Sequence, residues 1–247
     1  MKQSSSMSNL RVIGKGRVAQ IVTDDVWAYK LYPSWYPIEG IIKEAHILTQ
    51  IYTKTQLKSV TCEVLKDEHA LKMSLIHGKT IADMMRKEKF KEGIQCLIQT
   101  QVEVFQYHDL DCEDAFTAFE STLKHSSLQQ EVKDKALQSL SMIERKYHLC
   151  HFDMHLENIM MTDEGLVILD WMNAKLGNPT MDIARSYIIL SQYVKRQANP
   201  YLKQICQRLS IDIDDVLKAV PLMAALRMLE EESPQFKDQL SKLIHES

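Results

Sequence analysis

Two carboxylates and one amide within eighteen residues form the densest set of chemically competent side chains in the sequence. Asp153 is followed five positions later by Asn158, and Asp170 ends a short apolar run that follows an Asp-Glu-Gly turn. Carboxylate and amide oxygens are the ligands that a hard cation such as Mg²⁺ prefers, and protein-bound Mg²⁺ commonly contacts phosphate groups as well. The pattern therefore predicts a Mg²⁺ site.

A lysine and a glutamate in the first fifty positions are candidates for a second polar cluster. Lys30 lies inside an apolar run, 26–32, where a long cation is unexpected unless the strand is an edge or the ammonium has a partner. The next segment, 37–54, has apolar residues at helical spacing, and Glu44 lies off that stripe. Glu44 can therefore turn toward Lys30, and a solvated surface is the alternative for both side chains.

Two glycines near the start of the chain are candidates for phosphate contact. Gly14 and Gly16 lie between two predicted strands. A dinucleotide-binding turn needs a helix N-terminus at that point, so it is disfavoured. A glycine hairpin folded over phosphates is the functional interpretation, and an ordinary tight turn is the alternative.

The elements that would position these residues change from strands to helices along the chain. Runs of β-branched and aromatic residues predict three strands before the helix at 37–54 and two after it, at 59–66 and 69–75. This order is typical of a small antiparallel sheet carrying one helix, an α+β arrangement. The segment 111–120 is predicted as an acidic loop. The predicted helices of the second part span 80–88, 91–108, 128–147, 181–196, 201–208, 213–231 and 235–245.

Composition limits the class of protein. With 247 residues, of which 45% are hydrophobic, the chain can bury a full core, and we expect a flexible tail at 1–9 and lobes at 10–76 and 77–247. The net charge of −3 gives no electrostatic basis for binding nucleic acid or an anionic membrane. The five scattered cysteines indicate neither a disulfide framework nor a zinc site. With no export signal or membrane-length apolar run, we expect a cytoplasmic protein of unspecified oligomeric state.

The central stretch resembles a known catalytic loop. Residues 151–160, His-Phe-Asp-Met-His-Leu-Glu-Asn-Ile-Met, are similar to the His-Gly-Asp-x-His-x-x-Asn loop of the aminoglycoside phosphotransferase and choline kinase family. Residues 168–171, Ile-Leu-Asp-Trp, resemble that family's metal-binding strand, and 177–184 resemble its Gly-x-Pro-x-x-Asp-Ile-Ala segment. The resemblance implies a protein-kinase-like fold with two lobes: a small antiparallel-sheet N-lobe with one helix, and a larger helical C-lobe, with ATP bound between them.

The same resemblance implies a role for each candidate in ATP- and Mg²⁺-dependent phosphoryl transfer. Asp153 would accept or orient the proton of the acceptor hydroxyl, while Asn158 and Asp170 would hold Mg²⁺ against the phosphates. Lys30 would bind the α- and β-phosphates, and Glu44 would pair with Lys30. The other implied nucleotide contacts are the glycine loop and the backbone of the hinge, represented by Gly14, Gly16, Met73, Ser74 and Ile76.

Other residues near the loop have structural or open interpretations. His151 is interpreted as a ring that braces the loop, and Asp182 as a helix N-cap that supports it. His155 either faces the transferred phosphate, as a catalytic residue, or is structural. Phe152 replaces the family's usual glycine and Ala19 takes the third position of the glycine loop, so the acceptor pocket can differ from that of other members.

The acceptor itself is not specified by the sequence. Acidic residues at 111–120, 212–215 and 230–232 would suit a cationic acceptor, such as an aminoglycoside- or amino alcohol-like molecule, and an ordinary solvated surface is the alternative. A sugar-like acceptor also fits.

Two other functions compete with a small-molecule kinase. The first is a catalytically silent nucleotide-binding pseudokinase, which the retention of Lys30, Asp153, Asn158 and Asp170 argues against. The second is a protein serine/threonine kinase. Asp170-Trp171-Met172 stands in place of Asp-Phe-Gly, and only the eleven residues 171–181 separate Asp170 from Asp182, which is too short for an ordinary activation segment.

Overall fold

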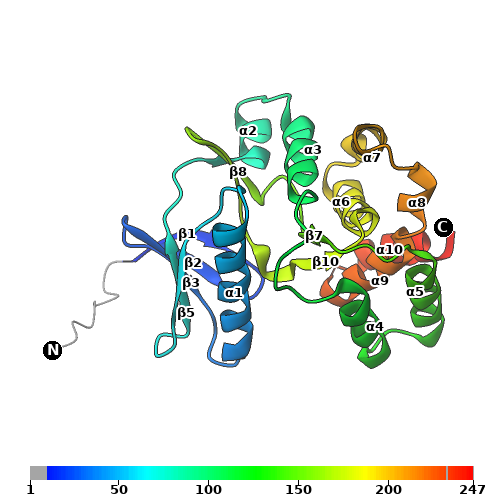
Figure 1. The fold of residues 1–247 in the computed structure, drawn as a ribbon, viewed down its shortest axis with the longest axis horizontal. Coiled ribbons are helices and arrows are strands. Elements are labelled where there is room, and N and C mark those ends of the chain that lie inside the picture. Colours follow the sequence, from blue (N-terminus) through cyan, green and yellow to red (C-terminus); the bar gives the residue numbers. More distant parts are fainter. Residues whose placement is uncertain (1–9, 232, 247) are drawn as a thin grey trace. The chain divides into compact units, whose positions relative to one another are not determined.

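The structure is a computed structural model, and it describes residues 10–231 and 233–246. The chain forms two compact units (Figure 1). The first comprises residues 10–79 and 160–172, and the second comprises residues 80–159 and the chain from 173 onward. The tail predicted at 1–9 lies outside the described residues, and the lobe boundary expected after residue 76 stays a prediction.

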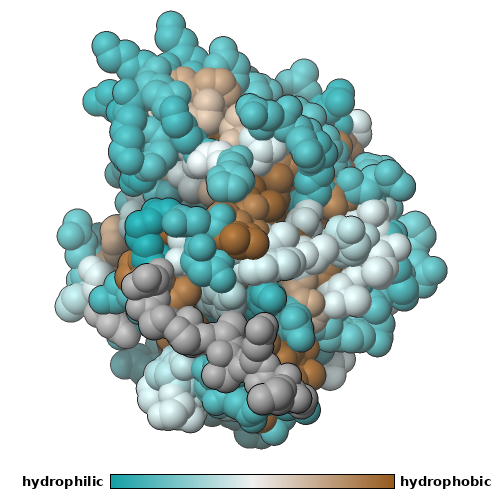
Figure 2. Space-filling view, turned by 90° about the vertical axis from the view of Figure 1, so that its left-hand side faces the viewer, coloured by the Kyte–Doolittle hydropathy of each residue, from teal (hydrophilic) through white to brown (hydrophobic). Residues whose placement is uncertain are grey.

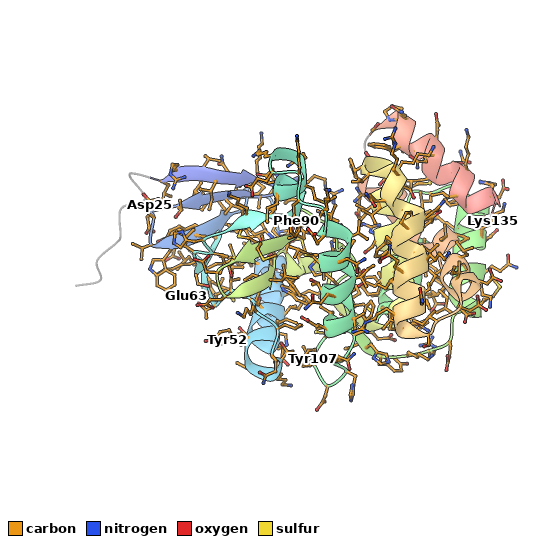
Figure 3. All side chains as sticks on the ribbon, turned by 90° about the horizontal axis from the view of Figure 1, so that it is seen from above. Asp25, Tyr52, Glu63, Phe90, Tyr107 and Lys135 are labelled. Atoms are coloured by element: carbon orange, nitrogen blue, oxygen red, sulfur yellow. The ribbon has the colours of Figure 1, made fainter. Side chains whose placement is uncertain are left out.

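A five-stranded antiparallel sheet, in the order β1-β2-β3-β5-β4, is the framework of the first unit. The predicted order of three strands, one helix and two strands is confirmed. Helix α1 (Ile38–Lys54) packs on β4 and β5 and buries its apolar stripe. Asp25 lies in the β2–β3 turn, and Tyr52 projects outward from the last turns of α1 (Figure 3). The strands are β1 (Arg11–Lys15), β2 (Gln20–Thr23), β3 (Trp27–Leu31), β4 (Cys62–Leu65) and β5 (Ala70–Ser74).

A second, three-stranded sheet lies largely in the same unit. It is formed by β6 (Lys79–Thr80), β8 (Ile159–Thr162) and β9 (Gly165–Ile168), in the order β6-β8-β9. Gly78, just before β6, lies so close to β8 that a Cβ atom there would be 2.3 Å from the carbonyl oxygen of Met161. A side chain at this position is therefore excluded, and the glycine permits the close approach of the two segments.

The second unit is mainly helical, with a two-stranded ladder of β7 (His148–Cys150) and β10 (Lys175–Gly177). Its central helix, α6 (Pro179–Tyr193), packs against α7, α8, α9 and β7, and all of 179–186 is buried. Side chains fill the space among these helices (Figure 3). The other helices are α2 (Ile81–Lys87), α3 (Gly93–Val104), α4 (Ala115–His125), α5 (Gln130–Met142), α7 (Lys195–Leu209), α8 (Ile213–Leu217), α9 (Val220–Glu230) and α10 (Pro234–Glu246), and η1 (Trp171–Asn173) is a short 3-10 helix.

Two predictions about where helices begin and end were wrong. The segment predicted as an acidic loop contains the start of α4, because the Asp114 side chain accepts the backbone N–H groups of Phe116 and Thr117 and so caps a helix. The helix predicted over 213–231 is two helices, α8 and α9, and Pro221 lies in the first turn of the second. Proline is tolerated there because its missing N–H would have no partner inside the helix.

One face of the molecule is drawn in Figure 2. Figure 2 shows a face that is mostly hydrophilic, with hydrophobic areas enclosed by hydrophilic side chains. No helix within residues 10–231 and 233–246 is both long enough and apolar enough to cross a membrane.

Candidate active site

The polar cluster of the first unit is centred on Lys30. Strand β3 places Lys30 Nζ 2.7 Å from Glu44 Oε1 on α1 and 2.9 Å from Asp170 Oδ1, just after β9. The Lys30 side chain is 11% exposed and that of Glu44 is 3% exposed. Tyr32, two residues beyond Lys30 and therefore on the same side of the strand, donates its hydroxyl hydrogen to the other Glu44 oxygen. Lys30 and Glu44 thus form a buried ion pair, and the solvated alternative is excluded.

The surroundings of Lys30 fix its charge. Burial would lower the pKa of the ammonium, but the nearby carboxylates of Glu44 and Asp170 outweigh burial and raise this pKa. Burial and the negative charge of Glu44 also raise the pKa of the Tyr32 hydroxyl, which therefore remains a hydrogen-bond donor. The result is a fixed positive charge of the kind that binds phosphate oxygens.

Asp170 has an unusual backbone conformation. Its φ angle is +59°, in the left-handed region that few residues other than glycine adopt, although aspartate tolerates it better than most. Its side chain is 45% exposed. The preceding strand is anchored by the Ile168 N–H, which donates to the carbonyl of Lys58 at 3.2 Å. Non-glycine residues with this backbone conformation cluster at functional sites. At Asp170, the side chain also remains partly accessible to solvent.

The candidate glycines lie at the β1–β2 hairpin. Gly14 is in β1, where the pairing with β2 shifts register, and Gly16 is in the turn. The Gly16 N–H donates to the carbonyl of Ala19 at 2.9 Å and closes the turn. The hairpin is thus formed as expected, and its contact with phosphate stays a prediction.

The candidate hinge residues lie at the end of β5. Met73 and Ser74 are its last two residues, and Ile76 follows in the connection to β6. The Ser74 N–H donates to the carbonyl of Thr61 at 3.0 Å, and Ser74 Oγ accepts the Thr61 N–H at 3.1 Å. These bonds hold the strand end in place, and its contact with adenine stays a prediction.

In the second unit, α6 holds the loop after β7 through one carboxylate. Asp182 Oδ1 accepts the Phe152 N–H at 2.6 Å, and Asp182 Oδ2 accepts the His151 N–H at 3.4 Å. The predicted N-cap role of Asp182 was wrong, because Asn178 caps α6 by accepting the Thr180 N–H at 2.9 Å. Asp182 does support the loop, as predicted, but it does so from a position inside α6 and not from the N-cap.

A buried network extends from this carboxylate. The hydroxyl of Tyr201 donates to Gln101 Oε1 at 2.5 Å, and Gln101 Nε2 donates to Ser186 Oγ at 3.1 Å. Ser186 in turn donates to the carbonyl of Met154 at 2.7 Å. Gln101 Nε2 also lies 3.4 Å from Asp182 Oδ2. Fully bonded buried networks of this kind give rigidity, so the loop has a fixed conformation.

The loop side chains converge on Asp153. The ring of His151 is fully buried, and its Nδ1 accepts the Asp153 N–H at 3.2 Å, which agrees with the predicted bracing role. Asn158 Nδ2 donates to the carbonyl of Asp153 at 2.9 Å, which turns the amide oxygen away from that contact. His155 Nε2 lies 3.7 Å from Asp153 Oδ2, which is too long for a direct hydrogen bond but close enough for an ion pair when His155 is protonated.

The pKa values of Asp153 and Asp182 are shifted in opposite directions. Burial would raise the pKa of Asp153, but the interactions with His155, Arg185 and His151 outweigh burial and lower it. Burial raises the pKa of Asp182, although His151 and the backbone N–H groups of Phe152 and His151 oppose this. Asp153 is therefore the stronger acid and is fully ionised at neutral pH, as expected for a carboxylate that binds a proton only transiently.

The donor set suits Mg²⁺ more than a transition metal. Among the described residues, no group of three His, Cys, Asp or Glu side chains forms a ready-made metal cluster. Mg²⁺ is usually held by only one or two protein carboxylates plus waters and phosphates. Asp170 in the first unit offers a half-exposed carboxylate, and Asn158 in the second unit offers an amide oxygen; each is a ligand type that Mg²⁺ accepts, and their joint role stays a prediction.

Two cavities lie at opposite ends of the β7–β10 ladder. The larger, about 610 Å³, includes His148 and Asn178 at the end where Gly177 pairs with His148. The smaller, about 40 Å³, includes Phe152 and Lys175 at the end where Lys175 pairs with Cys150. Because Asp153 follows Cys150 and Phe152, the smaller cavity is the one beside the candidate catalytic loop.

Sequence reasoning missed several residues of these clusters. Tyr32 was detectable, since it is two positions from Lys30 in an extended run. Ser186 was also detectable, since it is four positions from Asp182 and therefore on the same face of the helix. Gln101 and Tyr201 gave no local signal, because their contacts join segments about a hundred residues apart.

Comparison with known proteins identifies a sequence family and similar folds. The phosphotransferase enzyme family matches residues 96–220, just over half of the chain. No curated protein matches the sequence closely. The solved structures that are similar to this chain confirm the predicted α+β kinase fold. Their sequence identities, given below, are low, so these structures show the fold alone.

Three of these structures illustrate the similarity. A thermostable mutant of aminoglycoside phosphotransferase APH(4)-Ia in the apo form has a TM-score of 0.69 at 11% identity, covering 97% of this chain and 94% of that one. Choline kinase LicA from Streptococcus pneumoniae has a TM-score of 0.65 at 12% identity, with coverage of 97% and 94%. ADP-bound APH(2'')-Ib has a TM-score of 0.58 at 13% identity, with coverage of 97% and 93%.

Proposed function

This chain belongs to the phosphotransferase enzyme family, and we propose that it transfers the γ-phosphate of ATP to a hydroxyl group of a small molecule with the help of Mg²⁺. The observation that carries this proposal is the buried Lys30 ammonium, held 2.7 Å from Glu44 and 2.9 Å from Asp170. Burying a lysine ammonium costs free energy, and the two carboxylates offset that cost. A lysine that binds the phosphates of a nucleotide explains why the chain keeps a cation at this buried position.

The first unit supplies the nucleotide contacts in this proposal. Lys30 binds the α- and β-phosphates, while Glu44 and Tyr32 hold the ammonium in a fixed position. Asp170, which contacts Lys30 at 2.9 Å, would be one of the residues that hold the cation when a nucleotide is bound. The backbone around the hairpin covers the phosphates and the hinge backbone binds adenine, with the residues Gly14, Gly16, Met73, Ser74 and Ile76.

Asp170 and Asn158 would hold Mg²⁺ by a carboxylate and an amide oxygen. Bound Mg²⁺ would neutralise the negative charge on the β- and γ-phosphates. The proposal needs only these two protein ligands, because phosphates and waters complete the coordination of Mg²⁺. The half-exposed Asp170 side chain supports this assignment.

The loop of the second unit supplies the acceptor chemistry. Asp153 accepts or orients the proton of the attacking hydroxyl, and its lowered pKa keeps it in the ionised form. His155, 3.7 Å from Asp153, is proposed to stand beside the transferred phosphate and to add positive charge when it is protonated. Phosphoryl transfer depends mainly on positioning and charge neutralisation, so the rigid support of this loop favours catalysis.

The proposed acceptor is a small hydroxylated molecule, of the aminoglycoside, amino alcohol or sugar type. The structural relatives include APH(4)-Ia in complex with AMP-PNP and hygromycin B, and a choline kinase. ATP as the phosphoryl donor agrees with a cytoplasmic location, which the five free cysteines also favour.

The proposal is tested by measuring ADP formation from ATP and Mg²⁺ with a panel of aminoglycosides, amino alcohols, hydroxy acids, nucleosides and sugars. We expect at least one acceptor to stimulate turnover and to gain a phosphate detectable by mass spectrometry. Normal Mg²⁺-ATP binding without stimulation by any acceptor would favour a silent nucleotide-binding module instead. Transfer to serine or threonine in a peptide, but to none of the small molecules, would favour a protein kinase.

A further inference from the structure

The segment that carries Asp170 is closed by one side-chain hydrogen bond. The indole Nε1–H of Trp171 donates to the backbone carbonyl of Ile168 at 3.2 Å. Donor and acceptor lie on either side of Asp170 in the chain, so the bond encloses Leu169 and Asp170 in a short loop. Trp171 is 0% exposed and Ile168 is 3% exposed, so water does not compete for this bond.

The start of this short loop is anchored as well. Ile168 is the last residue of β9, and its N–H donates to the carbonyl of Lys58 at 3.2 Å. Ile168 thus uses its N–H to fix the end of the strand and its carbonyl to hold Trp171. The backbone of Asp170 lies between these two attachments, which restrict the conformations that it can adopt.

Asp170 needs such a restraint because of its backbone conformation. Its φ angle of +59° lies in the left-handed region, where the Cβ atom of an L-residue crowds the following carbonyl. Without a restraint, the chain would favour negative φ angles, and the carboxylate would point in another direction. The observed conformation places Asp170 Oδ1 2.9 Å from Lys30 Nζ and leaves the side chain 45% exposed. The backbone conformation therefore determines where this carboxylate is presented.

The contact with Lys30 is a weaker restraint on Asp170 than the indole bond. Ion pairs that include a partly exposed group are screened by solvent and salt, and they contribute little to stability. The Lys30 ammonium is also shared with Glu44, whose Oε1 is closer, at 2.7 Å. The bond from Trp171 is local and buried, so solvent does not weaken it.

Tryptophan suits this bond for a chemical reason. Its indole combines a large apolar ring with one N–H donor and no acceptor, so it can fill a buried position and still donate. Phenylalanine, the residue that follows the aspartate in an Asp-Phe-Gly motif, fills similar space but has no donor. With phenylalanine at position 171, the buried carbonyl of Ile168 would lose this partner, which is unfavourable.

We infer that Trp171 is a positioning residue, whose indole N–H holds Asp170 in the left-handed conformation that presents its carboxylate to Mg²⁺. The inference rests on the proposed phosphotransferase function, in which Asp170 is a metal ligand. It gives a reason for tryptophan rather than phenylalanine directly after that ligand. Loss of the indole donor should therefore weaken the binding of Mg²⁺ with nucleotide in a chain that still folds.

Two replacements of Trp171 remove the donor. Trp171→Phe also removes part of the buried ring, whereas benzothienylalanine, in which sulfur replaces the indole N–H, keeps the size and shape of the ring. The matched controls are Trp35→Phe, at a position that is 72% exposed, and Ile51→Val, at a fully buried position of α1. Ile51→Val removes a buried methylene group from a different element, so it lowers stability and separates stability from metal binding. Urea titration confirms that each variant is folded.

The measurement is the Mg²⁺ dependence of nucleotide binding. Titration calorimetry follows the binding of AMP-PNP to the full chain at a series of free Mg²⁺ concentrations. We expect both replacements of Trp171 to need about three- to tenfold more Mg²⁺ for half-maximal enhancement of binding, the factor that one hydrogen bond contributes. Excess Mg²⁺ should restore the wild-type affinity, because mass action overcomes a loss of metal affinity. Trp35→Phe and Ile51→Val should keep the wild-type Mg²⁺ requirement.

Several results would overturn the inference. One is an unchanged Mg²⁺ requirement with benzothienylalanine at position 171, and another is a loss of AMP-PNP binding that excess Mg²⁺ does not restore. An equal rise in the Mg²⁺ requirement of Ile51→Val would also overturn it, because metal binding would then follow stability. So would a wild-type chain that binds AMP-PNP independently of Mg²⁺, or not at all.

One further result separates this inference from the proposed function. A raised Mg²⁺ requirement in both Trp171 variants, together with no transfer of phosphate to any acceptor by the wild-type chain, would uphold the positioning role of Trp171. The same result would contradict the phosphotransferase function, because the binding measurement needs no acceptor.

Discussion

The backbone N–H of Phe152 donates a 2.6 Å hydrogen bond to the buried carboxylate of Asp182, thirty residues further along the chain. Phe152 has a φ angle of +57°, in the left-handed region. This conformation costs about 1–2 kcal/mol for a residue with a side chain. The bond to Asp182 and the burial of the ring together offset that cost, and they orient the backbone just before Asp153.

Replacing the Asp182 carboxylate by an amide should weaken this support. In Asp182→Asn, the oxygen can still accept one N–H, but the new NH₂ group must face the other donors, those of His151 and Gln101. We expect the free energy of unfolding to fall by about 1–3 kcal/mol, with a lower kcat. Urea titration and turnover measure the two effects. The matched control is Asp163→Asn, at an exposed position of the β8–β9 turn, and equal stability of the two variants would contradict the role of Asp182.

Loss of the Asp153 carboxylate should affect chemistry rather than nucleotide binding. We expect Asp153→Asn to lower kcat by about 10²–10⁴-fold, because an amide cannot accept the proton of the acceptor hydroxyl. The affinity for Mg²⁺-ATP should change little, since Asp153 is assigned to the acceptor. Glu157→Gln, at an exposed position in the same loop, is the control. An Asp153→Asn enzyme with normal kcat would exclude Asp153 as the base.

The pH dependence of stability should reveal the environment of Asp153. Its folded-state pKa is lowered from 3.8, because the interactions with His155 and Arg185 exceed the effect of burial. A lowered carboxyl pKa gives stability that is present above pH 3.8 and is lost as the pH falls through the folded pKa. The difference in unfolding free energy between wild type and Asp153→Asn should therefore shrink below pH 3.8. Urea titrations from pH 3 to 7 test the sign, and a difference that grows with acidity would be the opposite result.

The ion pair between Lys30 and Glu44 gives a prediction for nucleotide binding. In Glu44→Gln, the buried Lys30 loses its closest negative charge, so the pKa of its ammonium should fall and its hold on phosphate should weaken. We expect the KM for ATP to rise by about tenfold or more, and stability to fall by as much as about 3–5 kcal/mol, the range for breaking a buried pair. Glu39→Gln, exposed in the first turn of the same helix, is the control. Unchanged ATP affinity in Glu44→Gln would remove Lys30 from the nucleotide site.

Local patterns predicted the order of the strands and the helix that carries Glu44, and the family resemblance implied the loop that carries Asp153. Local patterns failed where a single residue determines the position at which a helix begins. The capping carboxylate of Asp114 starts α4 inside a segment that composition alone assigns to a loop, and Pro221 begins a new helix where apolar spacing predicts continuity. The contact of Asp182 with Phe152 depends on tertiary packing, which spacing along the chain does not encode.

Phe152 provides a test of the strained backbone conformation in the loop. Truncation of this buried ring removes its contact with Phe119 and should cost about 3–5 kcal/mol, of which glycine regains about 1–2 kcal/mol because it adopts the left-handed conformation without strain. Phe152→Gly should therefore be destabilised, yet more stable than Phe152→Ala by about 1 kcal/mol. This order is the reverse of that at most buried sites, where alanine is the better replacement. Urea titration of the pair measures the order of stability, and an alanine variant as stable as the glycine variant would show that the positive φ at residue 152 stores no strain.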